Sequence, residues 1–254
     1  MNENEPPMTK QLTGKVALVT GGSRSIGAAI AKRLAADGAA VALTHSASPE
    51  KADEVVRAIE AAGGKALAVR ADAGDAAAVK AAVAKTVQAF GRLDILVNNA
   101  GVTIVKPVND LSLDDFDRMV AVNVKGLFVA TQEAVRHMGE GGRIINIGSI
   151  NSAYVPFGGG SLYVLTKAAV AGLTKGLARD LGPRGITINN VQPGPTDTDM
   201  NPASGEFAKQ ARQCIALQRY AQADEIADFV AYLASPGASF ITGASLAIDG
   251  GYAA

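Results

Sequence analysis

The chain has 254 residues, of which 48% are hydrophobic and 19% charged, so we expect a folded globular protein rather than a disordered one. Lys and Arg together equal Asp and Glu at 24 each, and this balance gives no reason to expect nucleic acid or a membrane surface as a partner. A single cysteine excludes an internal disulfide, and with only two histidines beside it we expect no metal site of the usual nitrogen and sulfur type.

The amino-terminal residues MNENEPPMTK are polar and contain prolines, so a flexible tail is predicted over 1–12. They lack the apolar core of a signal peptide, and no apolar run along the chain reaches membrane-spanning length. We therefore expect a cytoplasmic protein.

Short runs rich in Val, Ile and Leu recur along the chain and are predicted as strands. Longer Ala-rich amphipathic segments separate most of them, and one of these has Pro49 near its start and Gly63 at its end, as helices prefer. Strands that are apolar throughout and alternate with helices predict one α/β domain over 13–254, built on a doubly wound parallel sheet. The predicted strands cover residues 16–20, 40–43, 66–69, 94–99, 143–148, 187–191 and 245–249.

The stretch TGGSRSIG (20–27) joins the first strand to the first helix, which is where α/β proteins hold phosphate groups. Gly21 follows the strand directly, and Gly27 lies where a missing side chain lets the helix pack on the strand. Ser25 is expected to cap the helix, at little cost if its φ is negative and with strain if its φ is positive. The alternative is a tight turn that holds no ligand.

The end of the second strand bears on the choice of cofactor. In a site for NAD, an acidic residue about 20 positions beyond the glycines binds the ribose hydroxyls. Here Thr44, His45 and Ser46 stand at that place with no acid, and Arg24 lies in the glycine turn. A guanidinium with no carboxylate beside it suits the 2′-phosphate of NADP(H). The alternatives are an ordinary solvated Arg24 and a surface His45 with no role.

Tyr163 and Lys167 are four residues apart, so on a helix both side chains lie on one face. The lysine ammonium is expected to lower the pKa of the tyrosine, which would let it exchange a proton with a carbonyl or alcohol oxygen. Ser149, at the end of the fifth strand, is placed to hydrogen-bond the same oxygen. The alternatives are a helix with a buried ring and a surface lysine, and a serine that only caps the strand end.

Read together, these residues resemble the short-chain dehydrogenase/reductase superfamily over about 13–252. The motifs that carry the resemblance are TGGSRSIG, NNAG (98–101), VNVKG (122–126), Ser149, Tyr163-x-x-x-Lys167 and PGPTDT (193–198). The segment ASFITGASLAIDGGY (238–252) resembles the branch that includes 3-oxoacyl-[acyl-carrier-protein] reductases and many bacterial ketone reductases.

The resemblance implies a single Rossmann-type domain with about seven parallel strands, usually a homotetramer, that transfers hydride between NADP(H) and a small carbonyl or alcohol substrate. It implies that Tyr163 is the general acid/base, that Lys167 lowers its pKa and binds the nicotinamide ribose, and that Ser149 orients the substrate oxygen. Asn123 would hold a water of the proton relay. The residues expected to bind the cofactor are Gly21, Ser23, Arg24, Ser25, Ile26, Gly27, His45, Ser46, Asp72, Ala73, Asn99, Ala100, Gly101, Tyr163, Lys167, Pro193, Gly194, Thr196 and Thr198.

The chain departs from the family pattern at two places. Ser25 stands where the family has the middle glycine of the turn, and Ser149 precedes Tyr163 by one residue more than is usual. The extra residue falls in the loop 150–160. This loop and a turn-rich lid near 193–210 are expected to surround the substrate. The candidate pocket residues are Ile104, Ile150, Asn151, Tyr154, Phe157 and the segment 199–210.

We therefore predict an NADPH-dependent enzyme that reduces a ketone or aldehyde to an alcohol. One alternative is an NAD-dependent alcohol dehydrogenase that works in the oxidative direction. The other is a nucleotide-binding regulatory protein that has kept the fold without catalysis.

Overall fold

The structure is a computed structural model that describes residues 10–254 of the chain. Its strands form one sheet in which every neighbouring pair is parallel, in the order β3-β2-β1-β4-β5-β6-β7. The order runs outward in both directions from the β1–β4 pair, which confirms the predicted doubly wound Rossmann-type sheet. The strands are β1 (Val16–Val19), β2 (Ala40–His45), β3 (Lys65–Arg70), β4 (Ile95–Asn98), β5 (Arg143–Ile147), β6 (Thr187–Pro193) and β7 (Ser245–Ile248).

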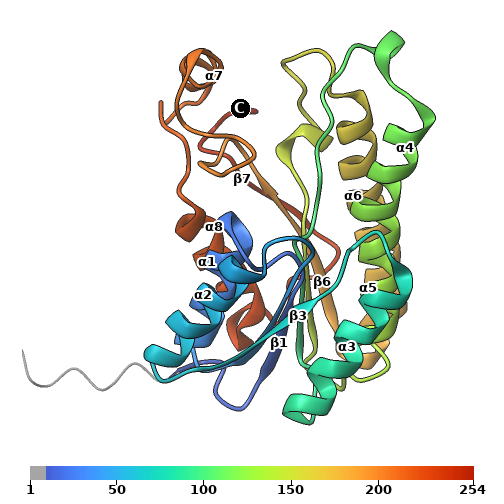
Figure 1. Ribbon diagram of the computed structural model, residues 1–254, viewed down its shortest axis with the longest axis vertical. Helices are drawn as coiled ribbons and strands as arrows, with labels where there is room; N and C mark the ends of the chain where they lie inside the picture. The colour runs from blue at the N-terminus through green and yellow to red at the C-terminus, as the bar shows by residue number, and fades with distance from the viewer. Residues whose placement is uncertain (1–9) are drawn as a thin grey trace, which may run out of the picture.

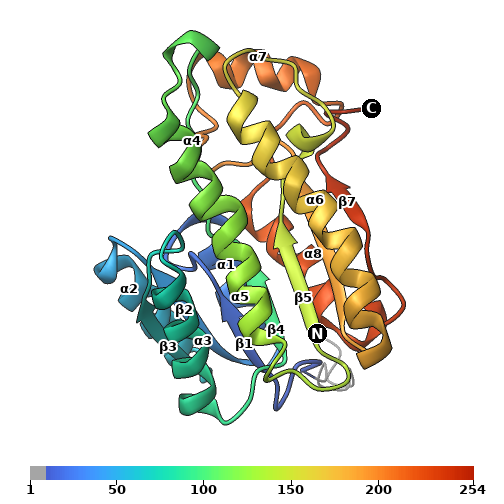
Figure 2. The same cartoon turned by 90° about the vertical axis from the view of Figure 1, so that its right-hand side faces the viewer.

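Helices cover both faces of this sheet. One layer consists of α1, α2 and α8, and the other of α3, α5 and α6, which lie in front of the sheet in Figure 2. The remaining helices, α4 and α7, extend beyond the carboxyl ends of the strands, at the top of Figure 1. The helices are α1 (Ser25–Ala36), α2 (Pro49–Ala61), α3 (Ala76–Phe90), α4 (Leu113–Val120), α5 (Leu127–Ala134), α6 (Ser161–Leu181), α7 (Glu206–Cys214) and α8 (Ala223–Ala234).

Each helical layer has its own apolar core against the sheet. Ile30 and Leu34 of α1 pack with Val230 of α8 on one face, and all three are fully buried. On the other face Val83 of α3 packs with Ala130 of α5. Strands between two such layers are buried on both sides, which is why β1 and β4 contain only buried residues.

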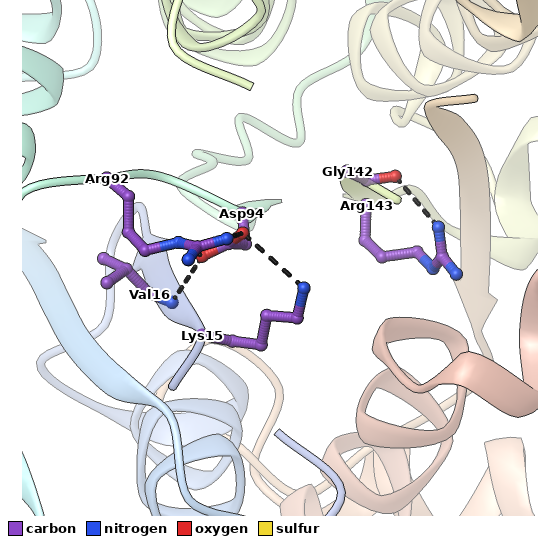
Figure 3. A network of polar contacts seen from close by, with 6 residues as sticks. All are labelled: Lys15, Val16, Arg92, Asp94, Gly142 and Arg143. Carbon is purple, nitrogen blue, oxygen red and sulfur yellow. Dashed lines mark hydrogen bonds and ion pairs between the residues drawn. The ribbon is translucent and has the colours of Figure 1, made fainter. Parts of the chain in front are cut away.

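Charged side chains at the amino edge of the sheet hold β1, β4 and β5 together (Figure 3). The Asp94 carboxylate accepts hydrogen bonds from Val16 N at 2.9 Å and from Arg92 Nε at 2.8 Å, and Lys15 Nζ lies 3.8 Å from it. Arg143 N donates to Asp94 O at 2.9 Å. The Arg143 guanidinium points away from Asp94 and donates to Gly142 O at 3.2 Å (Figure 3), and burial lowers its pKa. This edge therefore serves stability, and the carboxyl edge is left for a ligand.

The tail predicted over residues 1–12 extends too far toward the folded domain. Leu12, which the sequence placed in that tail, is 2% exposed, packs in the core against α1, and donates its backbone N–H to Asp37 O at 2.9 Å. Residues 1–9 of the predicted tail lie outside the described part of the chain. The predicted strands all exist, and their ends differ by one or two residues; β2, for example, continues to His45. Within residues 10–254, no helix is both long enough and apolar enough to cross a membrane.

Candidate active site

The glycine turn after β1 lies where the strand order reverses, and its glycines are there because no side chain fits. Gly21 has φ +63°, and a Cβ atom on it would come within 3.0 Å of the Ala100 backbone. A Cβ on Gly27 would lie 2.3 Å from Gly21 O and 2.5 Å from Asn99 Nδ2. The turn therefore brings the start of α1 against the loop after β4, and opens a backbone surface at the carboxyl edge.

Thr20 and Asn99 fasten this arrangement. Asn99 Nδ2 donates to Thr20 O at 3.0 Å and to Gly21 O at 2.9 Å, and Thr20 Oγ1 accepts from Asn99 N at 3.0 Å and from Ala100 N at 3.1 Å. The Asn99 side chain is thus committed to the turn. The predicted border of the cofactor would therefore be formed by the backbone of Asn99, together with Ala100 and Gly101.

Ser25 does not cap α1 as predicted. Its φ is +48°, the left-handed conformation that glycine adopts most readily, and the residue at the N-cap is Arg24, which makes no side-chain cap. The turn keeps the backbone shape of a glycine turn, so a serine at this place carries strain. The Ser25 hydroxyl accepts a hydrogen bond from Asp199 N at 3.3 Å.

The residues around the end of β2 present cations and hydroxyls. Arg24 Nη1 lies 3.6 Å and Lys51 Nζ 3.2 Å from the same oxygen, Asp199 Oδ2. His45 is buried rather than on the surface, which corrects one alternative, and its Nδ1 has no hydrogen-bond partner within residues 10–254. Ser46 next to it is exposed.

Asp72 follows β3, and its carboxylate is held in its charged form. Gly74 N donates to Oδ1 at 2.9 Å, and Arg118 Nη1 donates to Oδ2 at 3.2 Å. The backbone hydrogen bond from Gly74 and, to a smaller extent, Arg118 lower the pKa of Asp72. An ionised Asp72 only accepts hydrogen bonds, as a partner of an adenine amino group must. Ala73 beside it is packed against Gly126, where a Cβ would lie 2.0 Å from Ala73 O.

Tyr163 and Lys167 lie one turn apart on α6, next to Ser149 after β5. Lys167 is 7% exposed; its Nζ donates to Ile147 O at 2.8 Å and lies 5.6 Å from the centre of the Tyr163 ring. Ser149, 5% exposed, hydrogen-bonds the Tyr163 side chain, and its Oγ also accepts from Asn151 N at 3.1 Å. A surface lysine is therefore excluded, and the three side chains form one contact group at the carboxyl edge.

The expected lowering of the Tyr163 pKa by the ammonium is wrong for this structure. Burial removes hydration from the phenolate and raises the pKa of Tyr163, and the hydrogen bond with Ser149 lowers it by a smaller amount. Burial also lowers the pKa of Lys167 to about 8. Because its pKa is raised, the Tyr163 phenol keeps its proton at neutral pH. The Lys167 ammonium lies over the ring and donates to Ile147 O.

Asn123 lies in a six-residue π-helix, Ala121–Gly126, that interrupts the helical run between α4 and α5. Its Oδ1 accepts from Val102 N at 2.8 Å, and its Nδ2 donates to Val102 O at 2.9 Å and to Thr166 Oγ1 at 3.1 Å. Both amide hydrogens are used, so the side chain joins the loop after β4 to α6. Only a lone pair of Oδ1 is left for the water of the predicted relay.

The predicted lid residues follow β6. Pro193 ends the strand, and a Cβ on Gly194 would lie 2.6 Å from Asp249 Cα, so the two segments touch. Thr196 is buried and its Oγ1 donates to Gly194 O at 3.0 Å, while Thr198 Oγ1 accepts from Asn201 N at 3.0 Å. Both hydroxyls therefore shape the loop itself.

Beyond this loop, α7 forms a small apolar cluster that is separate from the two main cores. We call it the lid cluster; its buried members are Ile150, Ala208, Ala211, Ile215, Tyr220 and Tyr252. The Tyr154 ring packs edge-on against Tyr252, with the ring centres 5.5 Å apart. Phe157 packs over Gly160 in its own loop, and Ile104 is half-buried after β4. Ile150 and Tyr154 thus reach the lid, while Phe157 supports its loop.

Comparison with known proteins identifies the family to which this chain belongs. Residues 21–253 match the family model described as Enoyl-(Acyl carrier protein) reductase. Among solved structures, a short-chain dehydrogenase/reductase from Serratia marcescens BCRC 10948 is 62% identical, with a TM-score of 0.95 over 96% of this chain and 100% of that one. This chain belongs to the short-chain dehydrogenase/reductase family.

Other relatives of this short-chain dehydrogenase/reductase differ in what their names report. A Burkholderia cenocepacia short chain dehydrogenase solved in complex with NADP is 56% identical, with a TM-score of 0.95 over 96% of this chain and 100% of that one. The 3-oxoacyl-[acyl-carrier-protein] reductase FabG of Staphylococcus aureus Mu50 is 44% identical over 93% of this chain and 97% of its own length. The cyclic-di-GMP-binding biofilm dispersal mediator protein of Escherichia coli K12 is 46% identical over 95% and 98%.

The carboxyl edge of this short-chain dehydrogenase/reductase fits a dinucleotide phosphate. Gly21 and Gly27 let the turn pack directly against Ala100 and Asn99, where a Cβ would collide, as a glycine turn that approaches a phosphate requires. Arg24 and Lys51 already hold a carboxylate, which shows that an anion is stable beside the turn. The unpartnered His45 Nδ1 adds a polar atom at the end of β2.

Sequence reasoning missed three residues that organise the site, Thr20, Lys51 and Tyr252. It placed Asp199 in the candidate pocket segment 199–210 but did not predict its contacts. Thr20 is the first residue of the turn motif TGGSRSIG. Its hydroxyl, at the end of the first strand, could have indicated a hydrogen-bonding role in the turn. Lys51, Asp199 and Tyr252 act through contacts with distant parts of the chain, and no local pattern marks these contacts. Lys51 and Asp199, for example, are 148 positions apart.

Proposed function

We propose that this protein is an NADP(H)-dependent reductase that converts a ketone or aldehyde to an alcohol. The observation that carries the proposal is the contact group of Tyr163, Ser149 and Lys167 at the carboxyl edge of the sheet. In doubly wound sheets this edge, at the reversal of strand order, is where ligands bind. A proton donor, a hydrogen-bonding hydroxyl and a buried ammonium there suit carbonyl chemistry.

In the reductive direction, Tyr163 Oη and Ser149 Oγ hydrogen-bond the substrate carbonyl oxygen. NADPH, when bound, supplies the hydride for the carbonyl carbon. Tyr163 Oη gives its proton to the oxygen as the C=O bond becomes C–O, which leaves an alcohol and a phenolate. Solvent then returns the proton to Tyr163 Oη. Tyr163 is half-buried and its raised pKa keeps the phenol neutral at pH 7, which suits the acid role.

The choice of NADP(H) is supported by the charges around the end of β2. Thr44, His45 and Ser46 bring no carboxylate to the place where NAD enzymes have one, and Arg24 lies beside it. Arg24 would bind the 2′-phosphate, Asp72 the adenine, and Lys167 the nicotinamide ribose. The NADP complex of the Burkholderia relative agrees with this choice.

The substrate is proposed to be a small carbonyl compound with an apolar part. Ile150, Tyr154 and Tyr252 form an apolar wall between the site loop and α7. Asn151 is a polar group next to that wall, because its N–H bonds Ser149 Oγ and its Nδ2 donates to Tyr154 O at 3.0 Å.

A homotetramer is proposed as the assembly. Two separate surfaces expose large apolar side chains, one with Phe116, Phe128 and Leu165 on α4, α5 and α6, and the other with Tyr232 and Phe240 near α8 and β7. Two different self-complementary surfaces are what a tetramer of two-fold symmetry requires.

Cofactor titration followed by a substrate screen tests the proposal. NADPH and then NADH are titrated by cofactor fluorescence at fixed salt, and β-keto esters, aromatic ketones and aldehydes are screened for NADPH oxidation. We expect clearly tighter binding of NADPH and turnover of at least one carbonyl class. In Tyr163→Phe, turnover should fall by about 10²- to 10⁴-fold while the Kd for NADPH stays within about threefold. Tyr232→Phe, the same change far from the site, is the control.

The alternatives give different results. Equal or tighter binding of NADH would favour the oxidative, NAD-dependent dehydrogenase. Cofactor binding without turnover of any carbonyl or alcohol would favour a regulatory nucleotide-binding protein, and binding of cyclic di-GMP would then be measured because of the Escherichia coli relative. Turnover that survives Tyr163→Phe would remove Tyr163 as the acid.

A further inference from the structure

The segment between β6 and α7 reaches across the carboxyl edge to the glycine turn through one residue, Asp199. Its Oδ2 lies 3.2 Å from Lys51 Nζ and 3.6 Å from Arg24 Nη1, and its backbone N–H donates to Ser25 Oγ at 3.3 Å. Three contacts from one residue thus join the lid to the start of α1 and the start of α2.

The two cations flank the same place from different elements. Arg24 is the N-cap residue of α1, in the turn after β1, and Lys51 is in the first turn of α2, directly after β2. The residues between the end of β2 and the start of α2 are Ser46, Ala47 and Ser48, and none of them is acidic. Two positive side chains that converge on a single oxygen form a small anion site, and within residues 10–254 the anion in it belongs to the protein.

We propose that Lys51 and Arg24 together form the subsite for the 2′-phosphate of NADP(H), and that Asp199 is an internal competitor which this phosphate displaces. The inference rests on the proposed NADP(H)-dependent function. It adds Lys51 as a specificity-determining residue. It also couples the choice of cofactor to the position of the lid. The 2′-phosphate, which NADPH has and NADH lacks, would displace Asp199 and so release the segment before α7 from Arg24 and Lys51.

The strength of the contacts fits a competitor that can be displaced. All three charged side chains are between 51% and 57% exposed, so solvent screens both ion pairs. Exposed pairs of this kind change a binding constant by no more than about fivefold each. A phosphate carries up to two negative charges and more acceptor oxygens than a carboxylate, so it can replace Asp199.

Binding of four small ligands tests the competitor directly, without enzyme turnover. NADPH, NADH, 2′,5′-ADP and 5′-AMP are titrated by calorimetry into the full-length protein and into Asp199→Asn, which keeps the shape and removes the charge. We expect NADPH and 2′,5′-ADP to bind about three- to tenfold more tightly to the variant, and NADH and 5′-AMP to change by less than about twofold. Asp197→Asn is the matched control, because this neighbouring carboxylate accepts from Ala203 N and makes no ion pair in the described chain.

Lys51→Gln tests the other half of the inference. It should weaken NADPH and 2′,5′-ADP about three- to tenfold and leave NADH unchanged, and Asp199→Asn should have a smaller effect when Lys51 is already replaced. An equal gain for NADPH and NADH in Asp199→Asn, or no loss in Lys51→Gln, would overturn the inference. A wild-type protein without any preference for NADPH would instead contradict the proposed NADP(H) function, so the two failures can be told apart.

Discussion

At the scale of single residues, Ser25 shows how a turn can keep its shape without its usual glycine. The backbone there has φ +48°, and only one other non-glycine residue within 10–254, Gln218, has positive φ. The neighbours explain why the shape persists: Gly21 and Gly27 pack so closely against Ala100 and Asn99 that the turn cannot relax. The strain at Ser25 is therefore imposed by contacts on both sides of it.

Replacement of Ser25 by glycine should stabilise the protein. The left-handed conformation costs a residue with a Cβ about 1–2 kcal/mol, and the greater freedom of glycine in the unfolded chain offsets part of the gain. We expect a net increase of about 0.5–1 kcal/mol in the free energy of unfolding, measured by urea denaturation. Ser25→Ala keeps the Cβ and removes only the hydroxyl, so it should show no such gain. An equal gain in both variants would mean that the hydroxyl, and not the backbone, is the source of strain.

Lys167 carries a prediction about pH. Its folded-state pKa of about 8 is below its ordinary value of 10.5, so burial of the ammonium destabilises the folded protein below pH 8. Between about 8 and 10.5 the unfolded chain binds more protons than the folded one, and the contribution of this residue to stability rises with pH.

Lys167→Met should lose turnover and yet be at least as stable as the wild type at pH 7, since a buried charge is replaced by an apolar chain. The stability difference between the two proteins should shrink as pH rises from 8 to 9.5, measured by urea denaturation at each pH. A difference that does not change with pH would show that Lys167 is not an ammonium buried in the folded state.

At the scale of elements, hydrophobic pattern predicts what is buried but not which distant group a side chain contacts. All seven strands were predicted from their apolar runs. Four of them, β1, β4, β5 and β6, are buried throughout, whereas the edge strands β3 and β7 are partly exposed. The π-helix around Asn123 was not predicted, because one extra residue in a helical turn leaves the apolar period almost unchanged. Leu12 was placed in the tail because a single apolar residue among polar ones has no period.

The proposed catalytic group was predicted as a set of positions, and its electrostatics were not. Tyr163, Lys167 and Ser149 were identified by spacing and by the resemblance. The direction in which the Tyr163 pKa moves depends on the burial of the side chain, which raises it, and on the smaller effect of the hydrogen bond with Ser149, which lowers it. Neither is a property of the local sequence. For the same reason the long-range pairing of Asp199 with Lys51 could be found only in three dimensions.

At the scale of the whole molecule, the two exposed apolar surfaces predict how the proposed tetramer should dissociate. Phe128 on α5 is 40% exposed, and Phe240 before β7 is fully exposed. A charge at the centre of an apolar interface costs far more than the surface contact provides. Phe128→Glu and Phe240→Glu should therefore each yield dimers, and the double variant monomers, measured by light scattering after size exclusion. A wild-type protein that elutes as a monomer would contradict the tetramer.

The lid cluster has a consequence for local unfolding. Because Ile150, Tyr220 and Tyr252 pack with α7 apart from both main cores, α7 can detach as a cooperative unit while the seven-stranded sheet stays folded. Its backbone amides should then exchange with solvent deuterium through a low-energy opening that the amides of β1 and β4 do not share. The protein would thus combine a rigid platform, which keeps Tyr163 and Ser149 in register, with a cover whose opening rate can limit how quickly product leaves.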